Sequence, residues 1–261
     1  MNNVNAVVAD DWDSHWGSFD ASASSNPAQH YRHRLVARVV HRCRPRRLLD
    51  IGSGQGDLLE RLHDSLPATN LFGLELSSTG VERTLSKSPG ADVRCVDLLD
   101  ADAAGRISDI RADVAVCCEV LEHLDDPSTF LRTAASALAP GATLIVTVPG
   151  GPRSEFDRLI GHRRHYTPES IRQLLQSAGF VVVRADRAGF PFFNLCRLVV
   201  IGRGSRLATD VADGSTSRIA VAAMRVFEVL FRLNLRRSRW GWQNVVIARW
   251  PAGNRQADHG G

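Results

Sequence analysis

Glycines and acidic side chains gather in one part of the sequence in a pattern typical of ligand binding. The segment Asp50-Ile51-Gly52-Ser53-Gly54-Gln55-Gly56 follows a short apolar stretch, and Glu75 and Asp97 end the next two. Glycines between a strand and a helix let a ligand approach the backbone, and the first N–H groups of the helix lack intrahelical partners. Each charge-assisted hydrogen bond to such a carboxylate is worth about 1.5–3 kcal/mol. We therefore expect Glu75 to accept from ribose hydroxyls and Asp97 from an adenine amino group.

The same glycines fit a nicotinamide dinucleotide less well. The dinucleotide pattern GxGxxG would need its third glycine at position 57, where the chain has Asp57. A negative charge at the start of a helix also repels a pyrophosphate. The loop therefore favours a ligand without phosphates, and an NAD-dependent oxidoreductase is disfavoured.

A second group of candidate catalytic residues follows the apolar stretch 112–118. Glu119, Glu122 and His123 form the pattern ExxEH. Histidine has a pKa near neutrality, so His123 could remove the proton of an acceptor group, which contributes about 10²–10⁴-fold to a rate. The alternative is that His123 only caps a helix or orients its loop.

A basic loop comes later, with the sequence His162-Arg163-Arg164-His165-Tyr166. Its two arginines could hold a carboxylate or phosphate of an acceptor molecule. The alternative is a solvated loop that pairs with nearby acids.

Alternating elements must position these groups. The apolar patterns predict strands over 47–51, 70–76, 92–96, 112–118, 143–148, 180–183 and 243–250, and helices over 31–43, 57–66, 78–86, 127–138 and 168–178. Strands that alternate with helices indicate an α/β fold with a mostly parallel sheet and helices on both faces. Such sheets bind ligands beyond the carboxyl ends of their strands.

The same patterns divide the chain into regions. We expect an N-terminal helical cap over 1–45, a core over 46–187, a helical insertion over 188–240, the last strand of the core over 241–251 and a disordered tail over 252–261. The insertion contains an amphipathic helix over 219–231 followed by four arginines. We expect it to be a lid over the acceptor site. A membrane-surface helix serving a lipid-linked acceptor, a homodimer interface and simple packing on the core are the alternatives.

Composition narrows the class of protein. The chain has 261 residues, 44% hydrophobic and 23% charged, with no run of about 18 apolar residues, which favours a soluble globular protein. Five cysteines without a CxxC pair disfavour disulfides and structural zinc. The N-terminal residues show no signal pattern, so we expect a cytoplasmic location. The net charge of +4 could indicate an anionic partner, but Lys87 is the only lysine, and a GC-rich coding bias would also explain the arginines. Nucleic acid is an unlikely partner, because the arginines are spread along the chain and no separate RNA-binding module is visible.

Five segments together resemble the class I S-adenosylmethionine-dependent methyltransferases. They are LLDIGSGQG (48–56), LFGLEL (71–76), CVDLL (95–99), CCEVLEHLDDP (117–127) and LAPGATLIVTVP (138–149). The resemblance implies a Rossmann-like fold with a seven-stranded sheet. It also implies that the chain binds S-adenosylmethionine, a sulfonium cation. Asp50 would hold its ammonium group, and the methionine part would face Gly52, Ser53, Gly54 and Gly56. Glu75 and Leu76 would bind the ribose, Asp97 and Leu98 the adenine, and Cys118 and Glu119 would complete the site.

The ExxEH pattern further resembles the ubiquinone-pathway O-methyltransferases and the small-RNA 2′-O-methyltransferases. In those families it binds a divalent metal at the acceptor hydroxyl, sometimes with a later histidine, and metal lowers the pKa of such a hydroxyl. Here the candidate ligands are Glu119, Glu122 and His123 with His162 or His165; a metal-free site is the alternative.

The stretch from Asn26 resembles the NPxR entry of the ubiquinone-pathway enzymes, with Gln29 in place of the arginine. This leaves Arg32 as a candidate for binding the carboxylate of S-adenosylmethionine.

These observations predict in-line methyl transfer from S-adenosylmethionine to a hydroxyl group of a small molecule. Its acceptor could be a sugar, a phenolic or polyketide-like metabolite, or a quinone precursor. His123 would act as base, and His162, Arg163, Arg164, His165 and Tyr166 would contact the acceptor. An RNA ribose methyltransferase and a non-catalytic donor-binding protein that acts through a partner are the alternatives.

Overall fold

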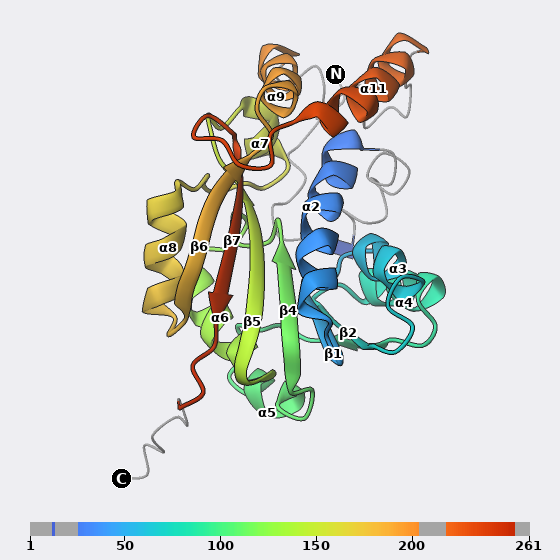
Figure 1. Ribbon diagram of the computed structural model, residues 1–261. Coiled ribbons are helices and arrows are strands. Elements are labelled where there is room, and N and C mark those ends of the chain that lie inside the picture. Colours follow the sequence, from blue (N-terminus) through green and yellow to red (C-terminus); the bar gives the residue numbers. More distant parts are fainter. Residues whose placement is uncertain (1–11, 14–25, 204–217, 254–261) are drawn as a thin grey trace, which may run out of the picture.

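The computed structural model describes residues 12–13, 26–203 and 218–253, and in them seven strands form one sheet (Figure 1). The strand order is β3-β2-β1-β4-β5-β7-β6; β7 pairs antiparallel with both β5 and β6, and the other pairs are parallel. This confirms the α/β fold with a mostly parallel, Rossmann-like sheet. The strands are β1 (Arg47–Ile51), β2 (Asn70–Glu75), β3 (Asp92–Cys95), β4 (Ala112–Cys118), β5 (Leu138–Pro149), β6 (Val181–Ala188) and β7 (Gln243–Arg249).

Helices cover both faces of the sheet. The described helices are α2 (Pro27–Cys43), α3 (Asp57–His63), α4 (Ser78–Lys87), α5 (Ala103–Ile107), α6 (Pro127–Ala135), α7 (Glu155–Leu159), α8 (Pro168–Ser177), α9 (Phe192–Arg203), α11 (Arg218–Leu230) and the 3₁₀ helix η1 (Phe231–Leu233). One face packs against α2 and α3, with α4 beside α3, and the other against α5, α6 and α8. Burial of these apolar faces is the main driving force that holds the sheet and helices together.

Local sequence signals set several helix ends. The Asn26 side chain accepts a hydrogen bond from the Ala28 N–H at 2.9 Å and so caps α2, whose first residue is Pro27. Thr167 and Ser170 form a capping box at the start of α8. Such caps satisfy helix N–H groups that otherwise lack partners, each cap being worth about 1 kcal/mol.

Several predicted boundaries are wrong. The helix predicted over 127–138 ends at Ala135, because Leu138 already pairs with Ala112 and begins a β5 that is twelve residues long. The sequence patterns missed α5 and α7, which have five residues each, and α9, which has no clear polar face. The amphipathic helix predicted over 219–231 is α11.

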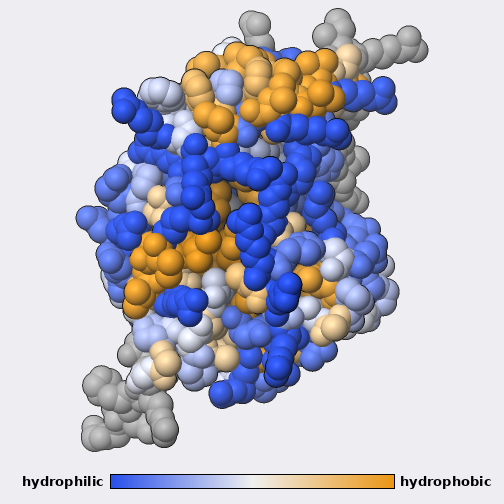
Figure 2. All heavy atoms as spheres, in the orientation of Figure 1, coloured by the Kyte–Doolittle hydropathy of each residue, from blue (hydrophilic) through white to orange (hydrophobic). Residues whose placement is uncertain are grey.

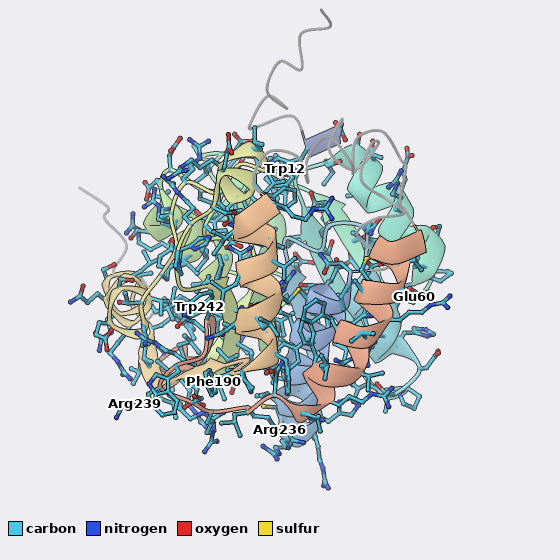
Figure 3. The ribbon with its side chains drawn as sticks, turned by 90° about the horizontal axis from the view of Figure 1, so that it is seen from above. Trp12, Glu60, Phe190, Arg236, Arg239 and Trp242 are labelled. Carbon is cyan, nitrogen blue, oxygen red and sulfur yellow. The ribbon has the colours of Figure 1, made fainter. Side chains whose placement is uncertain are left out.

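The insertion lies beyond the carboxyl ends of the parallel strands, where α9 and α11 project together with α7 (Figure 1). Seen from above, α9 and α11 run side by side with α2 between and beneath them (Figure 3). The predicted disordered tail lies largely outside the described residues, as does most of the segment before Asn26. Within the described helices, none is long and apolar enough to cross a bilayer.

Candidate active site

The order of the parallel strands reverses between β1 and β4, which pair directly with each other. In sheets of this kind, ligands bind in the crevice at this switch point. The glycine loop leaves β1, and the segment Glu119–His123 leaves β4. An added Cβ on Gly52 would lie only 2.5 Å from Cγ2 of Val120. The two motifs found in the sequence therefore meet at the place where a ligand is expected.

The glycine loop has a conformation that side chains disfavour. Gly52, Gly54 and Gly56 have φ angles of 74°, 57° and 82°, in the left-handed region that costs an ordinary residue roughly 1–2 kcal/mol. The Gly52 and Ser53 N–H groups both donate to the Leu74 carbonyl of β2, at 2.8 and 3.0 Å. The loop is therefore folded against β2 and brings its backbone close to the crevice.

Two buried carboxylates stand beside this loop. Burial, and secondarily the neighbouring Glu75, raises the pKa of Asp50 to about 8. No described residue donates a hydrogen bond to Asp50 Oδ1. Glu75 accepts hydrogen bonds from the Gly54 and Ser77 N–H groups, at 2.8 and 3.1 Å. This part of the crevice suits a cationic group, because positive charge would offset the cost of two buried carboxylates.

The predicted adenine contacts lie at the end of β3. The side chain of Asp97 accepts a hydrogen bond from the Leu99 N–H at 2.8 Å. Leu98 packs into the apolar core, whereas Leu76 and Leu99 are 47% and 44% exposed. Leu98 therefore offers a ligand its backbone and not its side chain.

Glu119 occupies the first position after β4 and has a φ angle of 57°. Its Oε1 accepts a hydrogen bond from Nε2 of Gln243 at 2.9 Å, and its Oε2 lies 3.6 Å from Nε of Arg32. Glu119 thus holds Arg32, the candidate for binding the carboxylate of S-adenosylmethionine, beside the site. Gln243 comes from β7, more than a hundred residues later, and no local pattern could have revealed it. Cys118, at the end of β4, is half-buried, and burial raises its thiol pKa.

Three histidines and a buried acid come together beyond β4. The rings of His123 and His162 lie 4.7 Å apart, edge to face, and the Nδ1 of His162 lies 3.2 Å from Nε2 of His165. Glu122 is completely buried, and neither carboxylate oxygen has a hydrogen-bond partner among the described residues. The ring of Trp12 stacks edge to face on His123 at 4.9 Å, and Figure 3 shows it from above.

Burial and neighbouring charges set the protonation states of Glu122 and His162. Burial, with the Coulombic effect of Glu119 second, raises the pKa of the Glu122 carboxyl well above its usual range. Burial, and then neighbouring His123, lowers the pKa of His162 to about 2, so its imidazole is neutral at physiological pH. The lone pair of a neutral imidazole is available to a metal ion, but with so low a pKa His162 would not keep a proton near neutral pH.

The histidine and carboxylate side chains of this cluster could bind a divalent metal ion. One ligand atom from each of Glu122, His123 and His162 lies within 4.8 Å of the others, and Asp157, His162 and His165 form a second such group. Imidazole and carboxylate are ordinary ligands of divalent cations. A cation would also satisfy the orphaned Glu122 oxygens, whose burial is otherwise costly.

Asp157 ties this cluster to the insertion. It is fully buried, and its two oxygens accept hydrogen bonds from the Arg197 guanidinium of α9 at 2.9 and 2.6 Å. Burial alone would raise its pKa, but the hydrogen bonds and charge of Arg197 lower it to about 2. The same carboxylate lies 3.8 Å from His162 and from His165. Neither Asp157 nor Arg197 carried a signal in the sequence, because they meet across forty residues.

The remaining residues of the basic loop have structural contacts. Arg163 donates to the His123 carbonyl at 2.5 Å and to Asp125 at 2.6 Å, and Arg164 donates to the Leu124 carbonyl at 3.0 Å. Tyr166 is buried and its hydroxyl donates to the Leu121 carbonyl at 2.9 Å. These contacts hold segment 121–125 in place. Acceptor binding by these three residues stays a prediction that the contacts do not support.

Comparison with known proteins decides the family. Residues 28–185 match the family described as "Methyltransferase domain". The chain belongs to this family. The match confirms the resemblance to class I S-adenosylmethionine-dependent methyltransferases that the five segments carry.

Individual relatives agree. The chain is 29% identical over 156 residues to a protein of Mycolicibacterium smegmatis named a probable S-adenosylmethionine-dependent methyltransferase, the match covering 58% of each chain. It is 25% identical over 175 residues to the ubiquinone biosynthesis O-methyltransferase of Aeromonas salmonicida, covering 60% of this chain and 71% of that one. This chain therefore spans less than two thirds of the M. smegmatis relative.

Solved structures show the same fold. The N-methyltransferase NodS of Bradyrhizobium japonicum, in complex with S-adenosylhomocysteine, superposes with a TM-score of 0.51. The superposition covers 87% of this chain and 89% of that one at 16% sequence identity, which supports the fold alone.

Proposed function

We propose that this methyltransferase-family chain transfers the methyl group of S-adenosylmethionine to a hydroxyl group of a small molecule. The observation that carries the proposal is the cluster of His123, Glu122 and His162 just after β4, in a segment whose Val120 meets Gly52 of the glycine loop. A hydroxyl acceptor must lose a proton as it gains a methyl group, and His123 is the group of this cluster that would take it. The resemblance to the ubiquinone biosynthesis O-methyltransferase is consistent with an oxygen acceptor.

The chemistry needs few groups. The acceptor oxygen attacks the methyl carbon in line with the departing sulfur, so that a C–O bond forms as the S–CH₃ bond breaks. The hydroxyl proton passes to the imidazole of His123, and S-adenosylhomocysteine leaves. Holding the two reactants close and aligned supplies most of the acceleration, and a positioned base adds about 10²–10⁴-fold.

The same residues also suit a divalent metal. Glu122, His123 and His162 would hold it. The predicted ligand Glu119 is outside this group, because its oxygens face Gln243 and Arg32. When bound, such an ion would lower the pKa of the acceptor hydroxyl. In that case His123 would serve as a ligand and not as the base.

Product analysis tests the proposal. The full chain is incubated with S-adenosylmethionine and a panel of phenols, catechols, sugars and quinone precursors, and methylated products are identified by mass spectrometry and NMR. We expect an O-methylated product whose formation falls at least about a hundredfold in His123→Ala. Methylation confined to nitrogen, carbon or RNA ribose, or full turnover in His123→Ala, would contradict the proposal.

A chelator arm separates the two forms of the mechanism. Loss of turnover with chelator that Mg²⁺, Mn²⁺ or Zn²⁺ restores would assign His123 to a metal site. Turnover that chelator leaves unchanged would assign His123 as the base.

A further inference from the structure

A cavity of about 520 Å³ lies between α2, α11, η1 and the exposed side of α3. None of its lining residues belongs to the glycine loop or to the histidine cluster. Its volume falls in the ordinary range for small-ligand sites. The lining residues are His30, Tyr31, Arg34, Arg38, Arg61, Glu228, Phe231, Arg232, Asn234 and Arg236.

The cavity carries a large excess of positive charge. Five guanidinium groups line it, and Glu228 is its one carboxylate among the residues that the structure describes. Glu228 is already engaged by Arg34 and by Nδ1 of His30, the latter at 3.2 Å. Like charges gathered around one space repel each other, and the described lining supplies too little negative charge to offset this repulsion.

The four other arginines of the cavity are available to a ligand. Arg38, Arg61, Arg232 and Arg236 are exposed, and within ranges 26–203 and 218–253 none forms an ion pair with a carboxylate. Burial lowers the pKa of the Arg38 guanidinium, and Arg236 and Arg34 lower it further. This shift has the sign expected where cations crowd together without an anion between them.

Buried donors add to the charge. The Nη2 of Arg34 and the Nδ2 of Asn234 are buried, and neither has a hydrogen-bond acceptor among the described residues. Asn234 is nine-tenths buried, and its Oδ1 is occupied by the Phe192 and Phe193 N–H groups, the first at 2.8 Å. Buried donors without an acceptor are costly, and an anionic ligand would supply acceptors.

We infer that this cavity is a second binding site, which takes a phosphate or diphosphate group of a phosphorylated ligand. Several guanidinium groups around one space match the charge and the multiple oxygens of such a group, which arginine binds through paired hydrogen bonds. The site is independent of the proposed methyl transfer. Helix α2 links the two, because Arg32 faces Glu119 while Arg34 and Arg38 line the cavity.

The phosphate could belong to a soluble molecule or to a lipid headgroup. Apolar side chains are exposed nearby on the insertion, and Figure 2 shows an apolar patch over α9 and α11 at the top of the molecule. These side chains are about half exposed and comprise Leu195, Leu198 and Val199 of α9 and Val226 and Val229 of α11. The test therefore needs an arm for each source.

Calorimetric titration of inorganic pyrophosphate into the full chain is the first arm. We expect binding that weakens with added salt and falls at least about tenfold in the double variant Arg38→Ala/Arg236→Ala. Arg172→Ala is the matched control, because this arginine lies on α8, on the other face of the sheet. Affinity for S-adenosylhomocysteine should be unchanged in all variants, which shows that they fold and separates this site from the methyl-transfer site.

Absence of pyrophosphate binding to the unmodified chain, or equal affinity in the double variant, would overturn the inference. Sedimentation with vesicles of phosphatidylglycerol or phosphatidylcholine is the second arm. Sedimentation with phosphatidylglycerol alone, lost in the double variant, would support a lipid headgroup as the source. Pyrophosphate binding without vesicle binding would support a soluble phosphorylated ligand.

Discussion

The two halves of the crevice are built in different ways. The predicted donor half is formed by three successive strand ends, and its acidic residues Asp50, Glu75 and Asp97 fall within a stretch of 48 residues. The proposed acceptor half joins Glu122 and His123 to the loop at His162, and through it to Asp157 and Arg197. A half made by local backbone geometry can be read from a sequence motif, whereas a half made by distant side chains depends on the tertiary fold.

The largest expected effect separates catalysis from donor binding. His123→Ala should cut turnover about a hundredfold or more, because the acceptor proton loses its recipient, while affinity for S-adenosylhomocysteine stays unchanged. His63→Ala, on the exposed side of α3, is the matched control. Kinetics and calorimetry on the same preparations make the comparison; a parallel loss of donor affinity would show that the halves are not separable.

The buried ion pair should matter next, through stability. Asp157→Ala or Arg197→Ala leaves the partner charge buried and unpaired, which typically costs about 3 kcal/mol or more. Urea unfolding should show this loss for each single variant and a smaller loss than their sum for the double variant. A loss below about 1 kcal/mol in both single variants would mean that the insertion is not anchored through this pair.

The same pair gives the stability a pH dependence. Because the pKa of Asp157 is lowered to about 2, its contribution is complete above the ordinary pKa near 3.9 and disappears as the pH falls from there through about 2. Asp157→Asn should remove this part of the acid dependence. Chemical unfolding of both proteins between these pH values tests the sign.

A moderate effect is expected on the donor side. Glu75→Gln keeps the size of the side chain and removes its charge, so affinity for S-adenosylhomocysteine should fall by more than about tenfold as charge-assisted hydrogen bonds are lost. Glu60→Gln on the exposed side of α3 is the control. Near-normal affinity of Glu75→Gln would remove Glu75 from the donor site.

The smallest effect is expected from the exposed ion pair of the acceptor half. Asp125 is 76% exposed and pairs with Arg163, and such pairs contribute about 0–1 kcal/mol. Asp125→Ala should therefore change turnover by less than about twofold. A larger loss would mean that the position of segment 121–125 depends on this contact.

Features set by local sequence could be predicted, whereas contacts between distant residues could not. β1 and β4 have their predicted bounds, because each is a short, mostly apolar run that ends at a glycine or a charged residue. Pro140-Gly141 indicated the end of a helix, yet both lie inside β5, since Leu138 pairs across the sheet with Ala112. Arg163 and Arg164 read as acceptor-binding residues by type alone, and only the fold shows their contacts with segment 121–125. The Asp157–Arg197 pair has no counterpart in any local pattern.

The most direct test is calorimetric titration of S-adenosylhomocysteine into the chelator-treated chain, both unmodified and as His123→Ala. It asks whether the glycine loop and its carboxylates bind the methyl donor. We predict micromolar binding in both, because the proposed donor half does not include the histidine cluster. Absence of binding to the unmodified chain would contradict the assignment of the glycine loop and its carboxylates to the donor.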